Sequence, residues 1–86
     1  MAEALPPAWL DDLGEFLAIP SVSADPAHAP DVARAGEWVA ARVRALGGEA
    51  ELREDGRLVV GEIAGQPGAP VVLVYGHYDV QPPTPL

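Results

Sequence analysis

The 86-residue sequence contains no cysteine and no lysine, and these absences exclude several classes of function. Without cysteine the chain can form no disulfide and offers no thiolate to a metal ion, which fits a reducing compartment. Its five cations are scattered arginines, set against 13 acidic residues, so the formal net charge is −8. Because no basic patch is present to neutralise phosphates, neither nucleic acid nor an anionic membrane surface is expected as a partner.

Long apolar runs are also missing. No stretch approaches the roughly 20 apolar residues that cross a bilayer. The first residues, Met1–Pro7, lack the cationic start and apolar core of a signal peptide. We therefore expect a soluble cytoplasmic protein. The hydrophobic content of 49% excludes a disordered chain, although a chain of this length makes at most one small domain of marginal stability.

The first element predicted by the sequence is a helix that begins near Pro6-Pro7, since proline is tolerated in a first helical turn. Apolar residues from Trp9 to Leu17 recur at helical spacing, and Pro20 ends the helix. We expect Trp9 to anchor helix packing. The opposite face carries three acidic residues, for which a solvated face is the simplest interpretation: Asp11, Asp12 and Glu15.

A second helix is predicted over about 31–46, after a proline-containing loop. Asp31 is the candidate N-cap, and an apolar stripe at helical spacing follows it. Gly47-Gly48 would close the helix in a left-handed C-terminal cap. Trp38, like Trp9, is expected to anchor helix packing.

Beyond residue 48 the pattern changes to the alternation typical of strands. A half-buried strand over 49–53 and a second strand over 57–64 flank Asp55-Gly56, a strong hairpin signal. The apolar run 71–75 predicts a third strand that is buried on both faces. The expected fold class is therefore α/β: two N-terminal helices, a β-hairpin and a buried strand. Because that last strand would have an open edge, we expect residues 1–86 to be the first part of a larger α/β domain.

Two residues with metal-site chemistry follow the apolar run. His77 and Asp79 come after Gly76, at the carboxyl end of the predicted strand, where ligand sites of α/β folds gather. In extended backbone both would point to one side, with Tyr78 directed away. Imidazole is the commonest metal ligand, and its second nitrogen usually donates to a carboxylate. We therefore predict that His77 is a metal ligand and that Asp79 orients its ring.

Simpler interpretations stay open for these residues and for others. His77 could be a surface histidine beside an aspartate that caps a turn. One histidine and one carboxylate do not bind zinc tightly, because a catalytic zinc site needs three protein ligands. Among the other polar residues, we expect His28 to be solvent-exposed in its loop. Ser21 and Ser23 would bond to local backbone in a turn, and Tyr78 would pack in the core or lie partly exposed instead of reaching substrate.

Two segments resemble a known enzyme family. The block Gly76-His77-Tyr78-Asp79-Val80-Gln81-Pro82 is similar to the first metal motif of the M20 family of metallopeptidases, which includes cytosolic dipeptidases of the carnosine-dipeptidase type. The segment from Phe16 to Pro26 resembles the early "IPSVS" stretch of that family. The order of helix, acidic strand, hairpin and metal strand also matches, so the resemblance spans nearly the whole chain.

The resemblance implies a fold and a chemistry. Residues 1–86 would be the N-terminal part of a mixed-sheet zinc-peptidase catalytic domain, with no dimerisation insert. His77 would ligate one of two zinc ions, with Co2+ or Mn2+ as other options, and Asp79 would hold the ring of His77 without touching the metal itself. The general base and the remaining ligands would lie beyond Leu86.

The expected function of the complete protein is the hydrolysis of dipeptides or short peptides by a metal-activated water. The isolated 86 residues are expected to be inactive and to bind zinc weakly. Two alternatives remain: removal of the acyl group from N-acyl amino acids, and a non-catalytic α/β fragment with an interaction role. The full-length protein could be a homodimer.

Overall fold

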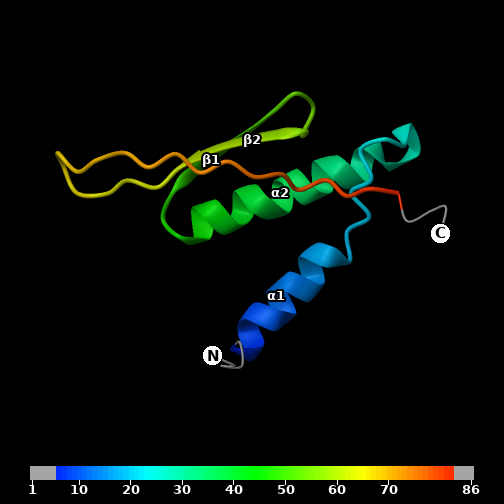
Figure 1. The fold of residues 1–86 in the computed structure, drawn as a ribbon, viewed down its shortest axis with the longest axis horizontal. Helices are drawn as coiled ribbons and strands as arrows, with labels where there is room; N and C mark the ends of the chain where they lie inside the picture. The colour runs from blue at the N-terminus through cyan, green and yellow to red at the C-terminus, as the bar shows by residue number, and fades with distance from the viewer. Residues whose placement is uncertain (1–5, 83–86) are drawn as a thin grey trace.

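The computed structural model describes residues 6–82, and it confirms the mixed α/β fold class. The expectation that Met1–Pro7 form no signal peptide concerns residues that lie mostly outside this range. Two helices precede a two-stranded antiparallel sheet (Figure 1). In order, the elements are α1 (Pro7–Leu17), the 3-10 turn η1 (Pro26–His28), α2 (Ala29–Ala45), β1 (Glu49–Arg53) and β2 (Leu58–Glu62).

Helix α1 begins at Pro7 and ends ahead of Pro20, as the sequence predicts. It meets α2 through side chains, with the rings of Phe16 and Trp38 4.8 Å apart and Arg42 bound to Asp12 at 2.9 Å. Part of its acidic face is therefore engaged by α2 and is not simply solvated. The expectation for Trp9 is wrong, because this side chain is 62% exposed.

Helix α2 begins two residues earlier than predicted, at Ala29. The turn η1 feeds directly into it, so His28 occupies the N-cap position and Asp31 lies in the first turn instead of capping the helix. The C-terminal end agrees with the prediction. Gly47 has φ +87°, and the N–H groups of Gly47 and Gly48 donate to the carbonyls of Arg44 and Val43 at 3.0 Å. This is a Schellman cap.

Strands β1 and β2 pair in an antiparallel register that runs from Glu49 opposite Glu62 to Arg53 opposite Leu58. The turn between them contains the predicted Asp55-Gly56, with positive φ at both residues. The hairpin packs on α2. Gly56 is buried there, because a β-carbon on it would lie 2.7 Å from the β-carbon of Ala33.

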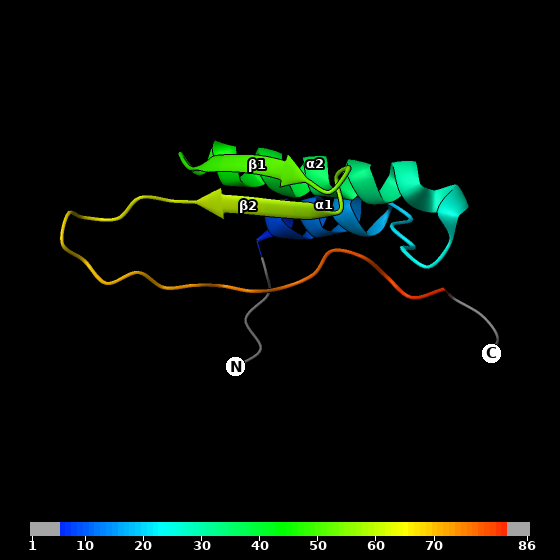
Figure 2. The same cartoon turned by 90° about the horizontal axis from the view of Figure 1, so that it is seen from above.

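The predicted third strand does not form in the described chain. Residues 71–75 belong to no strand, and their side chains are 81–95% exposed. Figure 2 shows this segment apart from both strands. A doubly buried strand needs neighbours on both edges and a layer on each face. The described residues supply only one backbone pairing nearby, a parallel bridge between Val22 and Val80.

The core lies between α2, the hairpin and the segment that joins α1 to η1. Its buried apolar residues are small: Val22, Val32, Ala35 and Ala40. Gly36 lies where three segments approach closely, since a β-carbon there would lie 2.7 Å from the Gly56 carbonyl oxygen and 3.1 Å from the Tyr78 hydroxyl. Helix α2, the hairpin turn and residues 76–80 therefore meet at one point, which fixes the position of His77 and Asp79 on the fold.

Candidate functional site

Residues 78–80 are held in place by contacts on two sides. The Tyr78 hydroxyl donates to the Gly56 carbonyl oxygen at 2.7 Å, which ties the segment to the hairpin turn. On the other side, the Val80 N–H donates to the Ser21 carbonyl oxygen at 2.9 Å. The Ser21 hydroxyl in turn donates to the Tyr78 carbonyl oxygen at 2.8 Å. These bonds place the backbone on both sides of Asp79.

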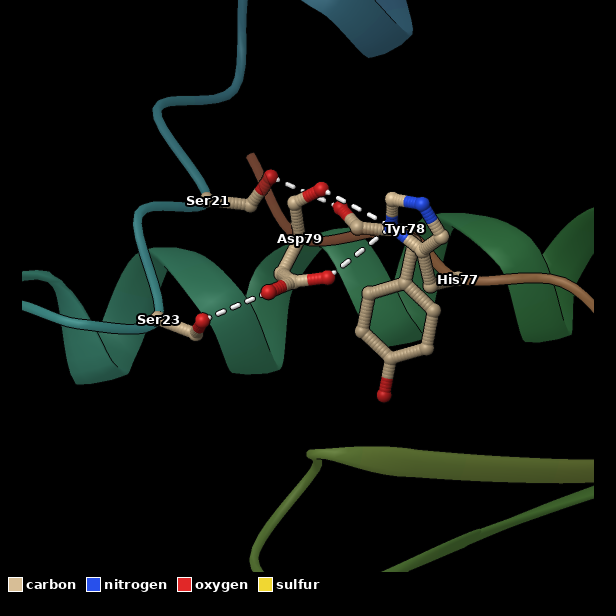
Figure 3. A network of polar contacts seen from close by, with 5 residues as sticks. All are labelled: Ser21, Ser23, His77, Tyr78 and Asp79. Atoms are coloured by element: carbon tan, nitrogen blue, oxygen red, sulfur yellow. Dashed lines mark hydrogen bonds and ion pairs between the residues drawn. The ribbon is translucent and has the colours of Figure 1, made fainter. Parts of the chain in front are cut away.

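His77 and Asp79 lie side by side (Figure 3). The distance from His77 Nδ1 to Asp79 Oδ1 is 3.0 Å, and that to the Asp79 carbonyl oxygen is 3.3 Å. The imidazole is 77% exposed and the carboxylate 38% exposed. When Nδ1 carries the proton and donates to Asp79, the lone pair of Nε2 is free to bind a metal ion.

The second carboxylate oxygen of Asp79 also has a partner. The Ser23 hydroxyl donates to Asp79 Oδ2 at 2.6 Å. This hydrogen bond is the largest cause of a lowered pKa at Asp79, to which the neighbouring His77 adds, while partial burial acts in the opposite direction. Asp79 is ionised at neutral pH with or without this shift, and an ionised carboxylate is a stronger acceptor for the imidazole N–H than a neutral group.

The prediction for the two serines is wrong. Instead of bonding to their own turn, Ser21 and Ser23 bind residues 78 and 79, more than fifty positions along the chain. Their spacing carries a signal that could have found this. Two hydroxyls at i and i+2 face one side of an extended segment, just as His77 and Asp79 do.

Tyr78 points away from its two neighbours and toward the hairpin (Figure 3). Its hydroxyl donates to the Gly56 carbonyl oxygen, and its side chain is half-buried. The prediction that Tyr78 packs in the core or lies partly exposed is therefore confirmed. Burial is the main reason that the pKa of Tyr78 is raised, with the negative charge of Asp79 adding to it. Tyr78 therefore serves to anchor the segment that carries the candidate site.

His28 is not the free loop histidine that the sequence predicts. It is half-buried, and its Nδ1 lies 2.8 Å from Asp31 Oδ2. Asp31 also binds Arg34 at 3.0 Å. The turn η1 places His28 at the start of α2, three positions before Asp31, and this local pairing explains the difference. His28 has no contact with the His77 site.

The donor set fits a metal only in part. An exposed imidazole whose other nitrogen faces a carboxylate has the chemistry of one zinc ligand. Within residues 6–82, no three histidine, aspartate or glutamate side chains come close enough together to hold an ion. The described chain thus offers one ligand and its orienting partner.

Comparisons with known proteins add an independent line of information. No protein-family model matches the sequence, and no solved structure matches it significantly. A search of the described helices finds none that is long and apolar enough to cross a membrane. The curated proteins that are similar to this chain include two that bear the same enzyme name.

The relative from Candida albicans is named Cys-Gly metallodipeptidase and is 34% identical over 95 residues, covering 93% of this chain and 20% of that protein. The relative from Schizosaccharomyces pombe is also named Cys-Gly metallodipeptidase and is 34% identical over 82 residues, covering 81% of this chain and 17% of that protein. The chain spans about a fifth of the length of these relatives. Over that span, it is related in sequence to metallodipeptidases.

Proposed function

We propose that this chain is the N-terminal part of the catalytic domain of a metal-dependent dipeptidase of the M20 type. The observation that carries the proposal is the pairing of His77 Nδ1 with Asp79 Oδ1 at 3.0 Å, in a chain similar over 93% of its length to a metallodipeptidase. The pairing leaves Nε2 as a metal-binding atom, and the similarity supplies the class of reaction.

In this proposal His77 contributes one ligand to a zinc site, with Co2+ or Mn2+ as alternatives and two ions in the complete enzyme. The bound metal would supply Lewis acidity and an activated water for amide hydrolysis. In this proposal Asp79 accepts a hydrogen bond from the Nδ1–H of His77 and thereby fixes the tautomer and angle of the ring. Tyr78 and its bond to Gly56 keep the segment against the hairpin, so that the imidazole stays at the surface of the fold.

The proposed substrates are dipeptides or short peptides, and the names of the relatives make Cys-Gly the first to test. We place the protein in the cytoplasm, which fits a chain without cysteine, and a homodimer is our proposal for the complete protein. The residues that finish the metal site are proposed to lie outside this chain. The 86 residues alone should then hydrolyse no dipeptide, and calorimetric titration should find zinc affinity weaker than micromolar.

The test uses the full-length protein that carries this chain, assayed against Cys-Gly, other dipeptides and N-acyl amino acids with and without added metal. We expect metal-dependent dipeptide hydrolysis. His77→Ala should remove bound metal and activity together. Asp79→Asn should lower activity but leave more metal bound than His77→Ala does. Loss of a residue that hydrogen-bonds to a metal ligand typically costs about 10- to 100-fold in metal affinity or activity.

Three results would count against the proposal. Hydrolysis of N-acyl amino acids in place of dipeptides would change the reaction, and no metal-dependent hydrolysis would favour an interaction role. If Asp79→Asn emptied the site as completely as His77→Ala, the division of roles between ligand and orienting partner would be wrong.

A further inference from the structure

We propose that Ser23 is a positioning residue for His77 and that it acts through Asp79. Its hydroxyl holds one carboxylate oxygen, so that the other is directed at the imidazole. The role we give this arrangement, which is to leave Nε2 of His77 unprotonated and able to bind a metal, rests on the proposed function. The arrangement itself is a property of the described chain and can be tested without metal or substrate.

The argument starts from the two oxygens of Asp79. Oδ2 accepts a hydrogen bond from Ser23 at 2.6 Å, and Oδ1 faces His77 Nδ1 at 3.0 Å. An exposed aspartate side chain can turn about two torsions. A short bond to one oxygen restricts both torsions, and it thereby sets the direction of the second oxygen. The bond is also charge-assisted, which makes it stronger than a bond between neutral groups.

Ser23 can hold Asp79 only if Ser23 is itself held. Its segment is docked two residues earlier, where Ser21 is 3% exposed and exchanges two hydrogen bonds with residues 78 and 80. Val22 is buried and forms the parallel bridge to Val80. Figure 3 shows both serines on one stretch of chain facing the 77–79 segment. The hydroxyl of Ser23 is thus presented by a fixed backbone.

The consequence for His77 is a choice of tautomer. A neutral imidazole in water prefers to carry its proton on Nε2, which would block that nitrogen as a ligand. An acceptor at Nδ1 reverses the preference and frees Nε2. Both acceptors near Nδ1 belong to Asp79, and the carboxylate oxygen is the nearer of the two. Fixing that oxygen therefore favours the tautomer that can bind a metal through Nε2.

The experiment is long-range 1H–15N NMR of the histidine side chains in the metal-free 86-residue chain at pH 8.5. The variants are Ser23→Ala, Ser23→Thr and Ser21→Ala. His28 is the internal reference, because its Nδ1 also faces a carboxylate, that of Asp31, and neither serine touches it. We expect His77 to be mainly protonated at Nδ1 in the unsubstituted chain. Ser23→Ala should remove that majority, while Ser23→Thr, which keeps the hydroxyl, should restore it.

Unchanged His28 signals in each variant show that the start of α2 is intact, and an unchanged Val80 amide signal shows that the segment of Ser21 and Ser23 is still docked. Ser21→Ala removes one bond of the docked segment but keeps the backbone bond from Val80 and the Val22–Val80 bridge, so His77 should keep its tautomer. An unchanged tautomer ratio in Ser23→Ala would overturn the proposal, since the backbone acceptor would then suffice. Equal loss in Ser21→Ala, or no rescue by threonine, would also overturn it, because docking of the segment and not the hydroxyl would be the cause. Neither result would depend on whether the complete protein is a dipeptidase.

Discussion

At the scale of single residues, Asp79 connects the candidate ligand to the rest of the fold. It faces His77 with one oxygen and Ser23 with the other, and its own backbone is held through its neighbours Tyr78 and Val80. Its ordinary partners would be water molecules, which fix no direction. Two protein partners make it an oriented carboxylate, and this is what a histidine ligand requires of its neighbour.

The pKa of Asp79 provides a direct measure of the Ser23 bond. Because this bond is the largest cause of the lowered pKa, Ser23→Ala should raise the pKa of Asp79 toward the ordinary aspartate value of about 3.9. A group with a depressed folded pKa stabilises the fold above its unfolded pKa and loses that contribution as the pH falls through the folded pKa. Carbon-13 NMR titration of the carboxyl group from pH 6 to pH 2 measures the shift. An unchanged midpoint in Ser23→Ala would contradict this cause.

The pairing of His77 with Asp79 could be predicted because it depends on two residues in one extended segment. The Ser23 contact could not be predicted with the same ease, because it joins positions 56 residues apart. Its formation depends on where the segment after α1 docks, and no local pattern encodes that. The contact between His28 and Asp31 is local, yet it was not predicted either, because it depends on a 3-10 turn that the sequence pattern did not indicate.

At the scale of elements, the fold depends on the close contact of α2 with the hairpin turn at Gly36. A β-carbon at this position would lie 2.7 Å from the Gly56 carbonyl oxygen, which is backbone and cannot turn aside. Gly36→Ala should therefore force the turn away from α2, at a cost of about 1–3 kcal/mol in the free energy of unfolding. The Tyr78 side chain should become more exposed to solvent at the same time, because its hydroxyl donates to that carbonyl oxygen.

Gly14 is the matched control for this substitution. It lies in α1 and is exposed, and a β-carbon at this position would have no neighbouring atom of the described residues within 4 Å outside its own helix backbone. Gly14→Ala should stabilise the chain by up to about 1 kcal/mol through helix propensity alone. Urea unfolding followed by circular dichroism compares the two. Equal effects of the two substitutions would show that the contact at Gly36 does not govern stability.

The elements whose ends are marked by local sequence features were predicted correctly, whereas the strand predicted over 71–75, which depends on distant neighbours, does not form in the described residues. Proline and glycine positions set the limits of α1, the end of α2 and the hairpin turn. Residues 71–75 have a strand-like composition, yet a strand exists only through its hydrogen-bonded neighbours. The described chain provides no such neighbours for them, so their apolar side chains stay exposed.

At the scale of the whole molecule, the 86 residues and the larger enzyme we propose should differ in the environment of residues 71–75, which are exposed in the first and proposed to be buried in the second. Leu73 is 92% exposed, so Leu73→Asp should change the free energy of unfolding of the 86-residue chain by less than about 0.5 kcal/mol. In the full-length protein, where we propose a buried strand, an unpaired charge at this position should cost several kcal/mol.

Urea unfolding of both proteins measures this difference, with Gln66→Ala as a control at a position that is exposed in the 86 residues. A small effect in the 86 residues and a large effect in the full-length protein is the expected result, because burial of the strand would come from neighbours outside this chain. A large loss of stability in the 86 residues would mean that they bury Leu73 themselves. A small effect in both would mean that residues 71–75 form no buried strand in either protein, and the proposed place of this chain within a larger sheet would then be wrong.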